Sequence, residues 1–128
     1  MGFDTFAFSS PTEGALIPAT ADQITGFITD FDPTEDKISM SISGIYQMNA
    51  TNIAKEASAS TNWTSLENKA QSALNISKKF FVGSISLGNE HTGTYLFGDA
   101  DGFGITNVVR LGDASLINNL KANNNWIV

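Results

Sequence analysis

Residues 37–42 carry the pattern that most constrains the fold of this chain. The run KISMSI alternates apolar and polar side chains, which places Ile38, Met40 and Ile42 on one face of an extended backbone. A period of two is typical of a β-strand that buries one face and exposes the other. The sequence therefore predicts a strand here, and a fold in which strands supply most of the core.

Further strands are predicted at 3–8, 22–31, 80–87, 93–98 and 105–111, where β-branched and aromatic residues gather between turn residues. Gly88-Asn89-Glu90 and the glycine-rich run 99–104 separate the last three of these strands. Regular strand and turn spacing of this kind predicts an antiparallel β-sandwich or β-roll.

One helix is predicted at about 64–76. Thr64 and Glu67 have the spacing of a capping box, in which each side chain bonds the backbone N–H of the other residue. The apolar residues that share one helical face are Leu66, Ala70, Ala73 and Leu74. The expected fold class is therefore mainly β, an antiparallel β-sandwich or β-roll cap with one short helix.

Length and composition agree with a single domain over residues 1–128. A chain of 128 residues can bury one core, and 41% hydrophobic residues with 16% charged residues and 11 glycines favour a turn-rich β protein. Cysteine is absent, which excludes disulfides, thiolate metal sites and a cysteine nucleophile.

The charge balance argues against some partners. A net charge of −6 with scattered basic residues makes nucleic acid a poor partner, whereas excess carboxylate suits divalent cations if several groups converge. The N-terminal residues MGFDTFAF lack the features of a signal peptide, and no apolar stretch is long enough to span a bilayer. No membrane insertion is expected.

Three segments together resemble a known family. Residues 2–6 (GFDTF) match the second half of the nine-residue calcium repeat G-G-x-G-x-D-x-U-x. Residues 22–38 contain the series D-Q-I, T-D-F and D-K-I, and residues 95–112 contain an aromatic strand, the turn DADGFG and the strand VVRLG. This combination resembles the end of the calcium repeats and the C-terminal cap in serralysin-type metalloproteases and related type I-secreted repeat (RTX) proteins.

The resemblance implies calcium as a cofactor and residues 1–8 as a remnant of the last calcium repeat. In relatives, aspartates in the positions of Asp4 and Asp22 close the final repeat site. The alternating acids of the turn at 99–104 also resemble the start of an EF-hand loop, but Arg110 stands where the twelfth-position acid belongs, which favours a glycine-rich β-turn. The candidate calcium ligands are Asp4, Asp22, Asp30, Asp36, Asp99 and Asp101. For Asp30 and Asp36 the alternative is a turn that needs no metal.

The final segment, residues 112–128, resembles a type I secretion signal. Polar asparagines precede a few hydrophobic residues, and the predicted signal residues are Asn125, Trp126, Ile127 and Val128. The family more often has an acidic residue where Asn125 stands. The alternative interpretation is a short final strand that completes the sheet, and both can hold at different times.

Catalysis is not expected. His91 is the only histidine, and the sequence contains neither H-E-x-x-H nor G-x-S-x-G nor a phosphate-binding loop. The favoured function is a non-catalytic C-terminal module of a secreted bacterial protein, which carries the export signal for a type I transporter and caps an upstream calcium-binding repeat domain. The alternative is a ligand- or surface-binding β-sandwich of a large adhesin or surface-layer protein, in which the region 44–87 contacts sugar, ice or a neighbouring subunit.

Overall fold

The structure is a computed structural model that describes residues 5–8, 31–42, 46–74, 77–86, 92–99, 105 and 107–127. The described strands form two sheets. The smaller sheet has the order β1-β2-β3, with β1 at Thr5–Phe8, β2 at Lys37–Ile42 and β3 at Tyr46–Gln47. The larger sheet has the order β4-β5-β6-β7, with strands at Ile53–Lys55, Phe80–Ile85, Gly93–Gly98 and Asn107–Gly112.

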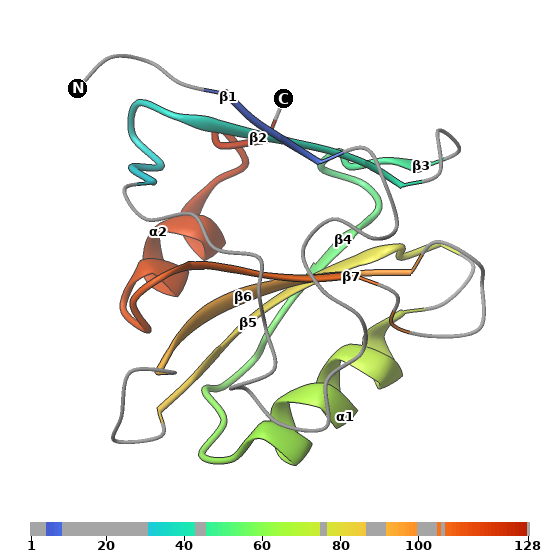
Figure 1. The fold of residues 1–128 in the computed structure, drawn as a ribbon, viewed down its shortest axis with the longest axis vertical. Helices are drawn as coiled ribbons and strands as arrows, with labels where there is room; N and C mark the ends of the chain where they lie inside the picture. Colours follow the sequence, from blue (N-terminus) through green and yellow to red (C-terminus); the bar gives the residue numbers. More distant parts are fainter. Residues whose placement is uncertain are drawn as a thin grey trace.

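In the described parts of the chain, two helices accompany the sheets. The helix α1 spans Trp63–Ala73 between β4 and β5, and α2 spans Leu116–Ala122 after β7. Figure 1 shows the smaller sheet, the larger sheet and α1 as successive layers, with α2 beside the space between the two sheets. The larger sheet is therefore covered on both faces.

This covering explains why β5 and β6 are buried along their whole length. Alternate residues of each strand serve opposite faces of the sheet. In β5, Phe80 and Val82 join the core cluster that contains β2 and α2 residues, whereas Phe81 and Ile85 join the cluster beneath α1. Sheets covered on both faces have continuous apolar strands instead of the alternation seen in β2.

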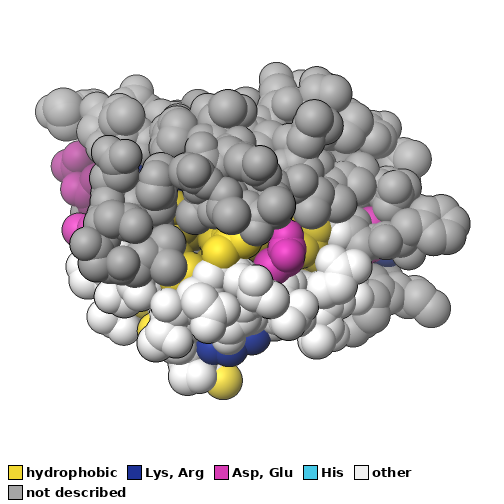
Figure 2. All heavy atoms as spheres, turned by 60° about the horizontal axis from the view of Figure 1, so that its bottom comes forward, with side chains coloured by type: hydrophobic (Ala, Val, Ile, Leu, Met, Phe, Trp, Pro, Cys, Tyr) yellow, Lys and Arg dark blue, Asp and Glu magenta, His cyan; other side chains and the backbone are white. Residues whose placement is uncertain are grey.

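The aromatic residues of the second cluster fix α1 against the sheet. Trp63, at the start of α1, lies edge-on to Tyr95 with ring centroids 5.3 Å apart and lies 5.8 Å from Phe97. Such contacts add to the stabilisation from apolar burial. Figure 2 shows the molecule from the α1 side, where backbone atoms and side chains that are neither charged nor hydrophobic make up most of the described surface in the lower half of the view.

The mainly β prediction is confirmed, and its antiparallel pairing holds for β2–β3, β5–β6 and β6–β7. The prediction was incomplete in two respects. Each sheet contains a parallel pair, β1–β2 and β4–β5, the second of which is connected through α1 as a βαβ unit. In addition, α2 makes a second helix inside the segment predicted as the export signal.

The predicted helix at 64–76 is confirmed as α1, although it starts earlier and ends at Ala73. Asn62, not Thr64, is the N-cap, and its side-chain oxygen accepts a hydrogen bond of 2.8 Å from the Ser65 backbone N–H. Asparagine is among the strongest N-cap residues, so the helix begins two residues earlier than the capping box at Thr64 predicted. The predicted strand at 22–31 lies outside the described residues, apart from Phe31.

Candidate functional site

The structure describes two of the six candidate calcium ligands. Asp36 precedes β2 and Asp99 follows β6, and both are buried. The remaining candidates, Asp4, Asp22, Asp30 and Asp101, lie outside the described residues.

Asp36 closes the turn that leads into β2. Its carboxylate accepts a 2.9 Å hydrogen bond from the backbone N–H of Asp32, and its own N–H donates to the Asp32 carbonyl at 2.7 Å. The Asp32 carboxylate in turn accepts bonds from the backbone and hydroxyl of Thr34, which lower the pKa of Asp32. Asp36 thus has a role in the turn that requires no metal, as the alternative interpretation of Asp36 proposed.

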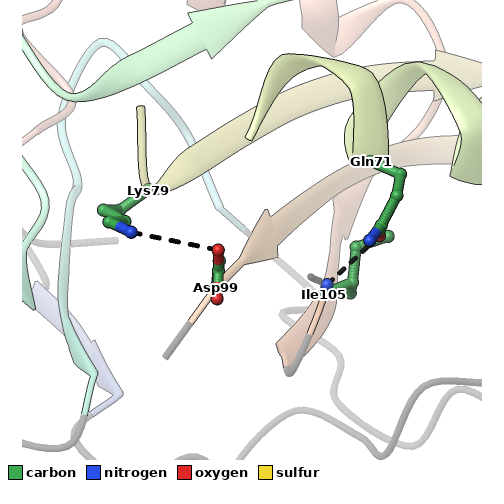
Figure 3. Close-up of polar contacts among 4 residues, drawn as sticks. All are labelled: Gln71, Lys79, Asp99 and Ile105. Atoms are coloured by element: carbon green, nitrogen blue, oxygen red, sulfur yellow. Dashed lines mark hydrogen bonds and ion pairs between the residues drawn. The ribbon is translucent and has the colours of Figure 1, made fainter. Parts of the chain in front are cut away.

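Asp99 forms an ion pair with Lys79. Their side chains are 4% and 10% exposed, and Lys79 Nζ lies 4.0 Å from Asp99 Oδ2 (Figure 3). The backbones also meet, because the Asp99 N–H donates to the Lys79 carbonyl at 3.0 Å. Figure 3 shows a second contact, in which Gln71 of α1 accepts a 3.2 Å bond from the Ile105 N–H. The Asp99 carboxylate is therefore paired with the Lys79 ammonium group.

A calcium ion takes six to eight oxygen ligands. Within the described parts of the chain, no three acidic or histidine residues come together in a group that could hold a metal ion. Asp36 and Asp99 thus belong to separate local networks, one with Asp32 and one with Lys79.

The described residues of the predicted secretion signal are part of the folded domain. The side chain of Trp126 is fully buried in the core cluster between the two sheets, beside residues such as Ile38 and Leu120. Its indole Nε1 donates to the carbonyl oxygens of Leu120 and Asn123 at 3.2 and 3.1 Å. Its own carbonyl accepts a 2.7 Å bond from the Ile38 N–H, and Ile127 forms a single parallel bridge to Ile38.

Asn125 is exposed, Ile127 is half-buried, and Val128 lies outside the described residues. Among the described C-terminal residues, the alternative interpretation of a final strand is thus met by one bridge, because the residues before Ile127 turn instead of extending along β2.

Two lysines of the sheets hold the same segment. Lys37 Nζ donates to the Asn125 carbonyl, and Lys55 Nζ donates to Asn124 Oδ1 at 2.8 Å and to the Asn123 carbonyl at 3.2 Å. Burial lowers the pKa of the Lys55 ammonium. Sequence reasoning missed both lysines, because each contact joins residues far apart in the chain and leaves no local pattern. We refer to residues 123–127 with these two lysines as the C-terminal anchor.

The described helices include none that is long and apolar enough to cross a membrane. Comparison with known protein families, curated proteins and solved structures found no match to this chain.

Proposed function

We propose that this chain is a non-catalytic C-terminal module of a type I-secreted bacterial protein. Residues 112–128 carry the export signal, and the domain caps an upstream calcium-binding β-roll outside the cell. The proposal starts from the family resemblance of residues 2–6, 22–38 and 95–112. The observation that supports it most is the complete burial of Trp126, a predicted signal residue, in the core.

Burial makes folding and recognition of the signal mutually exclusive. A transporter that reads Trp126 and Ile127 needs them accessible, and the folded domain encloses the first and half-buries the second. The signal is therefore available only while the chain is unfolded, the state in which a chain passes through a type I transporter. Folding outside the cell then converts the same residues into the C-terminal anchor.

The smaller sheet supports the capping role. β1 pairs with β2 in parallel and is the edge strand of the described sheet, so a parallel roll can continue the hydrogen-bonding pattern on the side where no described strand pairs with β1. β1 also falls within the predicted remnant of the last calcium repeat. A β-roll or sandwich completed in this way would leave no unpaired strand edge at the end of the repeats.

Export is expected to require the signal residues and not the stability of the domain. The whole chain is fused behind a passenger in cells with a type I exporter, and the secreted passenger is quantified by immunoblot. Deletion of residues 126–128 should reduce secretion at least about tenfold. Ile38→Ala is the matched control, because it opens a cavity beside Trp126 in the same core but leaves the signal intact, and it should be secreted normally. Undiminished export of the deletion, or an equal loss in both variants, contradicts the proposal.

Calcium is expected to stabilise the domain if the last repeat site is present. A ligand at 100 times its Kd adds about 2.7 kcal/mol to the free energy of unfolding, which raises the Tm of a domain of this size by about 10 °C. Thermal melts with calcium and with chelator measure this shift. Asp4→Asn and Asp22→Asn should abolish it, whereas Asp113→Asn, in the loop before α2, should not. Identical midpoints in the two conditions would remove calcium from the proposal for this chain.

A further inference from the structure

The edge of the larger sheet is interrupted after β4. The Glu56 N–H donates to the Val82 carbonyl as in a regular ladder, but the next donor of β5, the Ser84 N–H, bonds the Glu56 carboxylate instead of a backbone carbonyl. The Ser84 hydroxyl donates to the same carboxylate at 3.1 Å. Backbone pairing resumes at Ser60, which bonds Ser84 and Ser86. Residues 57–59 are thereby displaced outward as an exposed bulge.

This bulge forms one wall of a recess of about 760 Å³. The exposed side of α1 forms the other wall, and Phe81 lies at its base. Lys69 of α1 spans the two walls, because its Nζ donates to the Ser58 carbonyl at 2.7 Å. The volume lies within the range of small-molecule binding sites.

Uncharged groups line most of this recess. The α1 wall carries amide and hydroxyl side chains in succession: Asn62, Thr64, Ser65, Asn68 and Ser72. These residue types are weak helix formers, and a solvated helix face more commonly carries glutamate and lysine. Figure 2 agrees, since basic and acidic groups are few among the described residues on the α1 side.

Apolar surface completes the recess. Ala57 of the bulge, Ala73 of α1 and Phe81 of β5 contribute carbon atoms, as do the aliphatic stems of the two lining lysines, Lys55 and Lys69. Glu56, a residue that is 5% exposed, adds a hydrogen-bond acceptor whose position is fixed by Ser84. A ligand that fits must therefore present hydroxyl groups to one wall and C–H groups to the base.

We propose that the recess between α1 and the 57–59 bulge binds a neutral saccharide of one or two rings. Amides and hydroxyls both donate and accept, as sugar hydroxyls do, and the apolar base matches the C–H face of a pyranose ring. The lining carries one carboxylate and two lysines, and each of these groups is already bonded within the protein. Glu56 bonds Ser84, Lys55 bonds Asn124 and Lys69 bonds the Ser58 carbonyl, so the recess is not built around a charged ligand. This inference is independent of the proposed export function, because the recess lies within residues 55–81 and contains no part of the C-terminal anchor except Lys55.

The test uses the whole chain labelled with ¹⁵N and titrated with maltose, lactose and the disaccharide of N-acetylglucosamine, with glucuronate and butylammonium as charged probes. At least one neutral sugar should shift the amide signals of Ser58, Asn68 and Ser72 with a Kd in the millimolar range or tighter. Ser72→Trp fills the recess and Asn68→Ala removes one amide, and each should raise the Kd about tenfold or more.

Matched controls come from α2. Asn118 is an exposed amide on that helix, so Asn118→Trp and Asn118→Ala repeat both changes away from the recess and should leave the Kd unchanged. The proposal is overturned if no neutral sugar shifts these signals, if only a charged probe does, or if Ser72→Trp binds the sugar as tightly as the unaltered chain. Asn68→Ala keeps the test decisive if the tryptophan variant does not fold.

Discussion

Trp126→Ala is expected to lower the free energy of unfolding by about 3–5 kcal/mol, the usual range for loss of a large buried aromatic side chain. The indole lies fully buried between the two sheets, so its removal leaves a cavity in the core that they share. It also removes the donor that satisfies the carbonyls of Leu120 and Asn123. Urea denaturation followed by far-UV circular dichroism measures the change.

Two further substitutions separate the parts of this effect. Trp126→Phe keeps most of the apolar contact but removes the indole N–H, and it should cost about 1–3 kcal/mol. Asn125→Ala changes the exposed neighbouring side chain and should stay within about 0.5 kcal/mol of the unaltered protein. If Trp126→Ala is no more destabilising than Asn125→Ala, the C-terminal segment does not belong to the core.

Lys79→Met is expected to cost about 3 kcal/mol, because it leaves the Asp99 carboxylate buried without its cation. Asp99→Asn, which removes the other charge of the pair, should lower the free energy of unfolding by less. The long side chain of Lys79 can carry its ammonium group into water, whereas the short Asp99 side chain, 4% exposed, cannot follow. Urea denaturation at neutral pH measures both variants.

A double-mutant cycle tests whether the two charges act as a pair. The combination of Lys79→Met with Asp99→Asn should recover at least about 1 kcal/mol relative to the sum of the single changes. Lys121→Met, on the exposed surface of α2, is the control and should change stability by less than about 0.5 kcal/mol. Strict additivity in the cycle rules out a stabilising role for the ion pair.

The strands with a clear periodic or continuous apolar pattern could be predicted from the sequence. β2 alternates in sequence, and Ile38 of its apolar set is buried, whereas β5 and β6 are buried on both faces and are apolar or small throughout. β4 could not be predicted, because its three residues owe their conformation to pairing with β5 and have no period of their own. The parallel partners of β1 and β4 likewise depend on long-range contacts.

The candidate site was only partly predictable. The sequence distinguished Trp126 and Ile127 as signal residues, but their burial depends on distant core residues such as Ile38. The recess itself was not predicted, although the alternative function placed a binding surface somewhere in the region 44–87. Its bulge arises because Glu56 replaces a backbone acceptor for Ser84. A glutamate that replaces a backbone acceptor in this way leaves no recognisable pattern in the neighbouring sequence.

The C-terminal anchor also bears on how fast this chain can fold after synthesis. Lys37 and Asn125 are 88 residues apart in the sequence, as are Ile38 and Trp126. A ribosome that adds about 5–20 residues per second needs about 4–18 s to traverse that interval. The core between the two sheets cannot close before Trp126 has emerged, and closing so long a loop is slow in itself. Throughout that time the apolar side chains that this core buries, such as Ile38 and Phe80, stay exposed and can associate with other apolar surfaces.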